Sequence, residues 1–257
     1  MDTTKRTIIF FVIIFLLAAG LNIAPYLTLH RGTDQDVLHV GAGDDITGLL
    51  MEDVAAWTRD TDNPIELNLF MDCCGSAAQW AMTSGDLDVG FYCGSIALAL
   101  VNRSSDLEIY GPAVMNAEVA ALGGGGEEVG TIAVPMKRGF LHDIVYESFP
   151  DVTEISQAST TSLHYALSGG GGDGVVVDVA KALQAPGFNY VPLSGKDYVS
   201  YCLVVNKSVL GTPQFAEFLK TYNLAADHFN SADYLKDRYD MADSFWQAVN
   251  VKFLYFD

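Results

Sequence analysis

Two adjacent cysteines, Cys73 and Cys74, lie in the stretch "MDCCGSAAQWAM", between an apolar run typical of a strand and a run typical of a helix. A third cysteine, Cys93, also ends an apolar run and, like Cys74, is followed directly by Gly-Ser. Backbone N–H groups at a helix start stabilise a thiolate and lower the pKa of the thiol, which raises its affinity for soft metal ions. Thiolates select soft or borderline ions, whereas Ca²⁺ and Mg²⁺ take oxygen ligands. The repeated Cys-Gly-Ser therefore predicts a soft-metal site of Cys73, Cys74 and Cys93.

A structural role is the alternative for each cysteine. Cysteine is often a small buried hydrophobe, and packing is the preferred interpretation for Cys202, which falls within a predicted strand. Export normally oxidises cysteines into pairs, but neighbouring cysteines are badly placed to bond to each other. At most one of Cys73 and Cys74 is therefore expected in a disulfide.

The elements that position these residues alternate between strand and helix. Strands are predicted over 37–40, 64–74 and 87–93, each followed by a helix, and the pattern repeats with strands over 130–135, 152–160 and 174–178. An extended segment over 107–122 leads to the second set, a strand over 198–209 returns from it, and helices are predicted from Pro213 to the end. This order predicts parallel sheets with right-handed crossovers.

Ligands of open parallel α/β sheets bind beyond the carboxyl ends of the strands. If the first strand lies between the second and third, the ends carrying the cysteines start about 10 Å apart, at about 4.8 Å per strand, and loops can narrow that gap. Lys137 and Arg138 also follow a strand and suit a carboxylate, sulfonate or phosphate, with a solvated charge pair as the alternative. The predicted ligand-binding residues are Asp44, Asp45, Asp72, Cys73, Cys74, Gly75, Ser76, Tyr92, Cys93, Gly94, Ser95, Lys137, Arg138, Ser159 and Asp178.

The composition bounds the partners. Of the 257 residues, 32 are acidic and 14 basic, so the formal charge of −18 repels phosphate backbones and argues against nucleic acid as a partner. At the start of the chain, Lys5 and Arg6 precede the apolar run "IIFFVIIFLLAAGL". A basic flank before such a run is typical of a signal peptide or a membrane anchor. We therefore expect residues 1–30 to be one of these two, and the protein to be extracytoplasmic, in the periplasm or at the outer face of the cell membrane.

The predicted fold class is α/β with two lobes and a ligand cleft between them. The first lobe is expected over 31–112 and 201–257 and the second over 113–200, with crossings near Gly111 and Tyr201. The stretches "GDLDVGFYCGSIALAL", "VGTIAVPMKRG", "ALSGGGGDGVVVD" and "YCLVVNKSVL" carry a resemblance to the type II periplasmic binding proteins, the substrate-binding components of ABC importers. The sulfonate, nitrate and thiamine-precursor branch is the most similar. "DCCGSAAQWAM" and "GFYCGS" resemble cysteine- or selenocysteine-containing binding proteins associated with ABC transporter genes and an organometal lyase.

The resemblance implies an ABC permease and its ATPase as partners, and no catalysis. Together with the cysteines, it predicts capture of a thiophilic metal, metalloid or organometal species, with the bound metal as transported ligand and no certain cofactor. The first alternative is a small organic anion, a sulfonate or heterocycle, held by Lys137 and Arg138 with structural cysteines. An enzyme similar to thiamine-pyrimidine synthases is a further alternative, although the histidine pair of that motif is missing here. A disulfide-exchange role is disfavoured because no Cys-x-x-Cys occurs.

Overall fold

The structure is a computed structural model that describes residues 37–72, 74–123, 129–163, 165 and 172–257. The chain divides into two compact units, Met1–Gln35 and Asp36–Asp257, and the second of these contains all the described residues. Within these ranges, no helix is both long and apolar enough to cross a membrane. The predictions for residues 1–30 and for Cys73 fall outside the described residues.

The first of two sheets contains the parallel strands that precede the cysteines. Its strand order is β11 (Lys252–Phe253), β4 (Leu107–Met115), β10 (Val199–Asn206), β3 (Val89–Tyr92), β1 (Leu38–Gly43) and β2 (Ile65–Phe70). β1 is parallel to both β2 and β3, whereas β10 is antiparallel to β3 and β4. The predicted position of the first strand between the second and third is confirmed.

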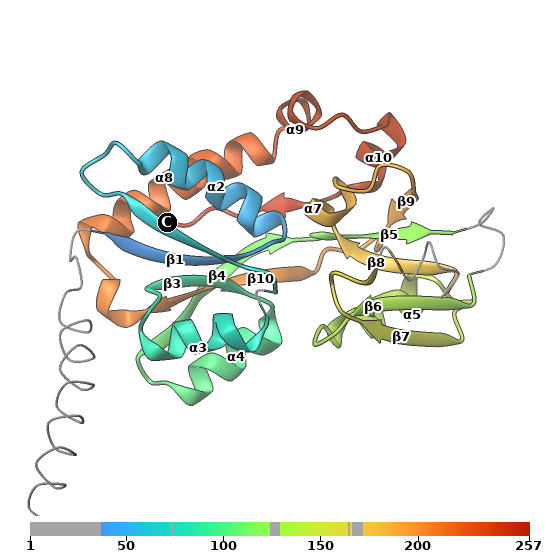
Figure 1. The fold of residues 1–257 in the computed structure, drawn as a ribbon, viewed down its shortest axis with the longest axis horizontal. Coiled ribbons are helices and arrows are strands. Elements are labelled where there is room, and N and C mark those ends of the chain that lie inside the picture. The colour runs from blue at the N-terminus through green and yellow to red at the C-terminus, as the bar shows by residue number, and fades with distance from the viewer. Residues whose placement is uncertain (1–36, 73, 124–128, 164, 166–171) are drawn as a thin grey trace, which may run out of the picture. The chain divides into compact units, whose positions relative to one another are not determined.

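Helices cover both faces of this sheet, as Figure 1 shows, with α2 and α8 on one face and α3 and α4 on the other. Their bounds are α2 (Ile46–Thr58), α3 (Ser76–Ser84), α4 (Gly94–Arg103) and α8 (Pro213–Phe229). Strands covered on both faces are apolar almost throughout, and every residue of β3 is buried. The strand ends are therefore the open edge of this sheet at which polar residues can gather.

The second sheet has five strands. Their order is β7 (Glu154–Ala158), β6 (Thr131–Pro135), β8 (Gly174–Asp178), β5 (Glu118–Leu122) and β9 (Asn189–Pro192), with helices α5 (Phe140–Ser148) and α7 (Val179–Ala182). β6 is parallel to β7 and β8, and β5 is antiparallel to β8 and β9. The sequence predicted β6, β7 and β8 but not the short strand β9. Most of the helix predicted over 161–170 lies outside the described residues.

Two segments connect the sheets and are hydrogen-bonded to each other. Asn116, between β4 and β5, donates its backbone N–H to the Tyr198 carbonyl (3.1 Å) and accepts the Tyr198 N–H on its side-chain oxygen (3.0 Å). Its amide nitrogen also donates to Asp197 (2.8 Å). β4 stays in the first sheet to Met115, so the first crossing lies a few residues beyond Gly111. The paired crossing segments are where a hinge between the sheets would bend.

The end of the chain is not helical throughout, which corrects the prediction. After α9 (Ala232–Arg238) and α10 (Asp243–Ala248), the chain forms β11 on the edge of the first sheet. The ring of Phe245 on α10 packs edge-on against Tyr190 of β9, with 5.2 Å between the ring centroids. The C-terminal segment therefore contacts both sheets.

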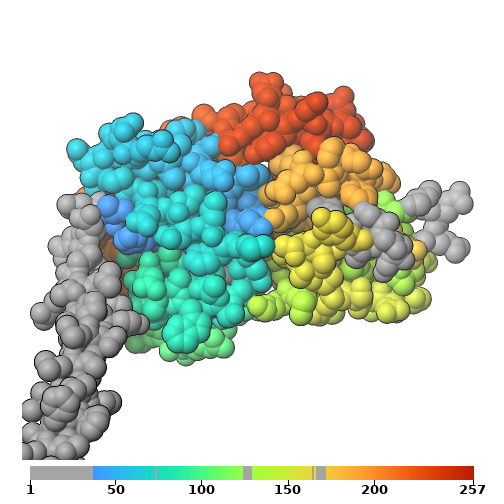
Figure 2. All heavy atoms as spheres, viewed as in Figure 1, coloured from blue at the N-terminus to red at the C-terminus, as the bar shows by residue number. Residues whose placement is uncertain are grey.

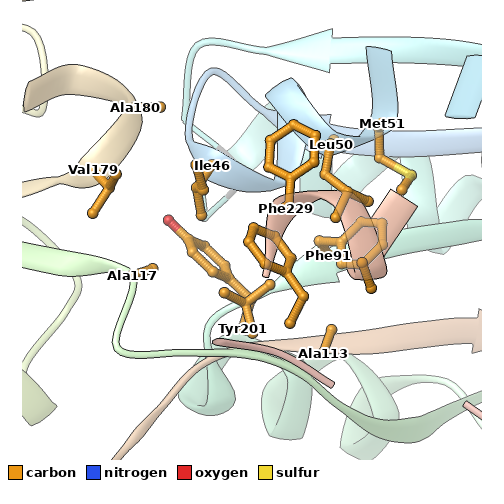
Figure 3. Close-up of a cluster of buried hydrophobic side chains, with 14 of the residues drawn as sticks. Ile46, Leu50, Met51, Phe91, Ala113, Ala117, Val179, Ala180, Tyr201 and Phe229 are labelled. Carbon is orange, nitrogen blue, oxygen red and sulfur yellow. The ribbon is translucent and has the colours of Figure 1, made fainter. Parts of the chain in front are cut away.

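The buried core is continuous between the sheets. Ile46 and Leu50 of α2, Phe91 of β3 and Phe229 of α8 are each at most 1 % exposed and belong to one cluster that also contains residues of β5, β8 and α7. Figure 3 shows Tyr201 within this cluster, its hydroxyl group pointing toward the side where Ile46 and Val179 lie.

Capping by Asp45 fixes the start of α2 at the end of β1. The Asp45 carboxylate accepts hydrogen bonds from the Thr47 backbone N–H (2.9 Å) and hydroxyl (2.5 Å), which satisfies a free donor of the first turn. Gly48 is required because a Cβ there would lie 2.1 Å from the Gly43 carbonyl oxygen. These local choices hold Asp44 and Asp45 at the carboxyl end of β1.

Candidate functional site

A small cavity lies where the carboxyl ends of strands from both sheets meet. It is lined by Asp44, Asp45, Met71, Asp72, Pro135, Arg138, Thr160, Leu163, Val177, Asp178 and Lys181. Figure 2 shows elements of the first sheet, blue to cyan, meeting those of the second, yellow to orange, along one seam. The cavity has a volume of about 20 Å³ for a water-sized sphere, which is room for about one water molecule. Any larger ligand requires the facing elements to separate.

Three polar contacts bridge the sheets around this cavity. Lys181 of α7 forms an ion pair with Asp44 (Nζ to Oδ2, 2.5 Å), and Lys137 lies 3.8 Å from the Asp72 carboxylate. Between them, the backbone N–H of Ile46, the first residue of α2, donates to Asp178 Oδ1 of the second sheet (2.9 Å). A carboxylate at a helix start is favoured by the free N–H groups and by the helix dipole. These contacts join the two sheets at the cavity.

Behind the cavity, a buried network surrounds Arg138. Its guanidinium forms a salt bridge with Glu118 of β5 and donates to the Tyr201 hydroxyl, which in turn donates to Asp178 Oδ2 (2.9 Å). The second Glu118 oxygen accepts from the Ser200 hydroxyl (2.6 Å). The Arg138 and Glu118 side chains are 4 % and 0 % exposed. Arg138 was predicted to hold an organic anion, but Glu118 already balances its charge.

Negative charge exceeds positive charge at this site. On the described residues, five carboxylates (Asp44, Asp45, Asp72, Glu118 and Asp178) lie at or beside the cavity with three cations (Lys137, Arg138 and Lys181).

Two carboxyls of this site have a raised pKa. Burial and the nearby Asp45 charge raise the pKa of Asp178 well above its ordinary value, although Arg138 opposes the shift. Burial likewise raises the pKa of Asp44, with Lys181 partly offsetting it. A cationic group entering the cavity would relieve this repulsion.

The structure brings two of the predicted cysteines together. Cys74 lies between β2 and α3, Cys93 is the N-cap residue of α4, and their sulfur atoms are 2.8 Å apart with both residues 0 % exposed. Loops thus close the gap expected from the strand spacing. Neither cysteine lines the cavity. Asp72, two residues before Cys74, does line it, and the Asp72 carboxylate accepts a hydrogen bond from the Cys74 N–H (3.0 Å).

The expectation of a lowered thiol pKa is wrong for Cys93. The hydrogen bond with Cys74 and burial raise the pKa of the Cys93 thiol far above its ordinary value, and they outweigh the Ile96 N–H that lowers it. Burial and the nearby Cys93 charge also raise the pKa of Cys202. The Cys93 thiol is therefore protonated in this arrangement, and metal binding to its sulfur would have to release that proton.

The sulfur separation lies between those of two chemical states. Two sulfurs bound tetrahedrally at about 2.3 Å from one metal ion are about 3.8 Å apart, whereas a disulfide is about 2.05 Å long. The observed 2.8 Å would have to widen by about 1 Å for the first state and narrow by about 0.8 Å for the second. On the described residues, which exclude Cys73, no three His, Cys, Asp or Glu side chains are grouped to hold a metal.

The other predicted residues fall into two groups. Gly75 and Ser76 start α3, and Gly94 and Ser95 start α4, where the Ser95 hydroxyl lies 3.6 Å from Cys93 Sγ. The second group consists of Tyr92 and Ser159, and neither group lines the cavity. Tyr92 is buried and its hydroxyl donates to the Ala78 carbonyl (2.9 Å), while Ser159 is exposed and hydrogen-bonds with Thr161 and Ser162.

Sequence reasoning missed several lining residues, of which Lys181 matters most. It lies in the single turn of helix after β8, three residues beyond Asp178. Lys181 could have been predicted at this site, because the first helical turn after an apolar strand that ends in Asp lies at the same sheet edge as that Asp. Thr160 lies next to the predicted Ser159, in the polar stretch "STTS" that ends a predicted strand. The remaining missed residues, Met71, Pro135, Leu163 and Val177, are apolar and carried no such signal.

No protein-family model and no curated protein matches the sequence. Solved structures match it in fold. The zinc-bound ligand-binding component of an ABC-type import system from Staphylococcus aureus has 13 % identity and a TM-score of 0.60, with 85 % of each chain covered. A nutrient-binding protein from Burkholderia cenocepacia bound to methionine has 14 % identity and a TM-score of 0.58, covering 76 % of this chain and 95 % of that one.

A third match is the periplasmic substrate-binding protein of an ABC transporter from Coxiella burnetii, with 14 % identity and a TM-score of 0.58, covering 83 % of this chain and 99 % of that one. Identities this low show the fold alone. The predicted two-lobed α/β fold of the periplasmic binding proteins is confirmed, and the sulfonate, nitrate and thiamine-precursor branch stays a prediction.

The Arg138–Glu118 pair predicts a large loss of stability when one partner is removed. In Arg138→Met the Glu118 carboxylate stays buried without its cation, which should cost about 3–5 kcal/mol in the free energy of unfolding, measured in urea. The control is Lys196→Met, which removes an exposed ion pair with Glu147 and should cost far less. The double variant Arg138→Met/Glu118→Gln should recover part of the loss. If Arg138→Met and Lys196→Met lower the free energy of unfolding equally, the buried pair is not needed for stability.

Asp178 predicts a pH dependence of a definite sign. The pKa of Asp178 is higher in the folded state than in the unfolded state. Its favourable contribution to the free energy of unfolding is therefore complete at a pH below the unfolded-state pKa, and it is lost as the pH rises through the folded-state pKa. The Tm of Asp178→Asn relative to the unaltered protein should therefore rise between pH 5 and pH 8. Asp173→Asn is the matched control, because hydrogen bonds from Thr131 lower the pKa of Asp173 and its contribution is instead lost as pH falls. A pH-independent difference for Asp178→Asn would contradict the charged surroundings described above.

Proposed function

We propose that this protein is the extracytoplasmic solute-binding component of an ABC importer, and that it captures its ligand between the two sheets. The observation that carries the proposal is the cavity at the facing strand ends, crossed by the Lys181–Asp44 and Ile46–Asp178 contacts. This is the edge at which open α/β sheets bind ligands. The fold likeness to substrate-binding proteins of importers supports the same function.

Binding requires opening and closing of the two lobes. The cavity admits about one water molecule, so the bridging contacts must break before a solute enters and be replaced by contacts to it. The crossing segments at Asn116 and Tyr198 are the natural hinge, since few residues there absorb the change. The protein would then deliver its ligand to a permease and its ATPase, with residues 1–30 directing export or anchoring it to the membrane. No catalytic turnover is expected.

The proposed ligand is a thiophilic metal, metalloid or organometal cation bound by Cys74 and Cys93, with Cys73 as the third sulfur. The two described thiols lie at the strand edge next to Asp72, and the surplus of carboxylates around the cavity attracts cations. Widening the sulfur pair by about 1 Å accommodates a metal ion. In the organic-anion alternative, Lys137 and Arg138 hold the ligand. Arg138 would have to exchange Glu118 for it, and this exchange would leave a buried carboxylate uncompensated.

The reduced full-length protein in mild detergent, titrated with Hg(II), Cu(I) and Zn(II), tests this ligand. One tight equivalent is expected, detected by thiolate absorbance, with proton release at Cys93, whose thiol pKa is raised. Cys74→Ser and Cys93→Ser should weaken binding at least 100-fold, as should Cys73→Ser if it supplies the third sulfur. Cys202→Ser is the matched control and should bind as the unaltered protein does.

Binding that is indifferent to Cys74 and Cys93, or no saturable binding, would contradict a thiol site. The importer function is tested separately by whether the solute that binds also drives ATP hydrolysis by a permease and ATPase.

A further inference from the structure

We propose that Cys74 and Cys93 form a disulfide when the protein is oxidised, and that this bond controls whether the thiol site is available. The proposal rests on the proposed function, since it names a regulation of that site. The bond itself requires only that the two sulfur atoms approach each other, whether or not a metal ion binds. The 2.8 Å between the two sulfur atoms is less than the 3.6 Å between Cys93 Sγ and Ser95 Oγ, and the sulfurs need to approach by only about 0.8 Å more.

The positions of the two cysteines favour this bond over the alternatives. Both precede helix starts on neighbouring crossovers, with Cys74 before α3 and Cys93 before α4, so the bond would join two rigid elements. A bond between Cys73 and Cys74 is disfavoured because adjacent residues hold their Cβ atoms badly for it. Cys202 lies opposite Tyr92 in the β10–β3 register and is close enough to influence Cys93 electrostatically, so a Cys93–Cys202 bond is the competing outcome.

The chemistry is a thiol–disulfide exchange with a disulfide oxidant of the exporting compartment, for which oxidised glutathione is the laboratory substitute. The first thiol loses its proton and attacks the oxidant, releasing one thiol and leaving a mixed disulfide. The second thiolate then displaces the other half of the oxidant. In sum, Cys74 and Cys93 lose two protons and two electrons, one S–S bond forms, and the oxidant is reduced to two thiols.

Burial decides when the exchange takes place. Both cysteines are 0 % exposed, so glutathione reaches them only during folding or when the elements around them open. Once formed, the bond is reached by a thiol reductant only through the same opening, and the reverse exchange then restores both thiols. The disulfide also removes both thiolates as metal ligands, because each sulfur is then bonded to the other. Oxidation therefore switches the site off, and reduction restores it.

The positions of methionine make the bond directly detectable. Cyanogen bromide cleaves after Met71, Met82 and Met115, which places Cys73 and Cys74 on fragment 72–82 and Cys93 on fragment 83–115. Full-length protein in detergent is equilibrated with oxidised glutathione, its free thiols are blocked with N-ethylmaleimide, and it is cleaved and weighed by mass spectrometry. Fragments 72–82 and 83–115 should be joined and should separate on reduction. Cys73→Ser should leave them joined, whereas Cys74→Ser and Cys93→Ser should not.

Two further readouts test the bond and its effect on the thiol site, and the first of them does not depend on ligand binding. The closed bond should raise Tm by roughly 5–10 °C over that of the reduced protein. The oxidised protein should also lose the tight Hg(II) equivalent that the reduced protein binds.

Fragment 83–115 joined instead to fragment 137–241, which carries Cys202, would overturn the proposal, and so would two fragments that never join. If the bond forms but the reduced protein binds no metal, the proposed ligand fails while the disulfide stands. If the reduced protein binds metal but the bond never forms, only the disulfide fails.

Discussion

The buried carboxylate of Asp178 is the interaction on which the relation between the two sheets depends. It ends β8 in the second sheet, and its Oδ1 accepts the N–H of Ile46 at the start of α2 as well as that of Ala180. Its Oδ2 accepts from Tyr201, which links it to Arg138 and Glu118. One side chain thereby joins a helix start of one sheet to the buried ion pair of the other.

The same carboxylate explains why the bridging contacts between the sheets can be replaced by contacts to a ligand. Burial, together with the nearby Asp45 and Glu118 charges, disfavours the ionised form of Asp178 even though its carboxyl group bridges the sheets. The contacts that hold the lobes together are therefore opposed by charge repulsion at the same place. A cationic ligand would add positive charge beside Asp178 and Asp45, where the carboxylates outnumber the cations. Attraction and repulsion of this kind fit a protein that must both close on a solute and release it.

Much of the fold was predictable from sequence because strand and helix periodicity alternate clearly after residue 37. The positions of Asp44, Asp45, Asp72 and Asp178 at the cavity followed from the rule that ligands lie at strand ends. Three features were not predictable. The raised pKa of Cys93 comes from a through-space neighbour, the neutralisation of Arg138 comes from Glu118 on a distant strand, and Lys181 reaches Asp44 across 137 residues. Each depends on tertiary placement, which periodicity does not encode.

Residue-resolved amide hydrogen exchange of Ile46 and Ala180 tests most directly whether the lobes open. Both N–H groups donate to Asp178 Oδ1, but only the Ile46 bond crosses between the sheets. Our account predicts that Ile46 exchanges through a partial opening with lower free energy than global unfolding, while Ala180 stays protected. If both amides exchange only by global unfolding, the two sheets do not separate in the native state and capture between them is contradicted.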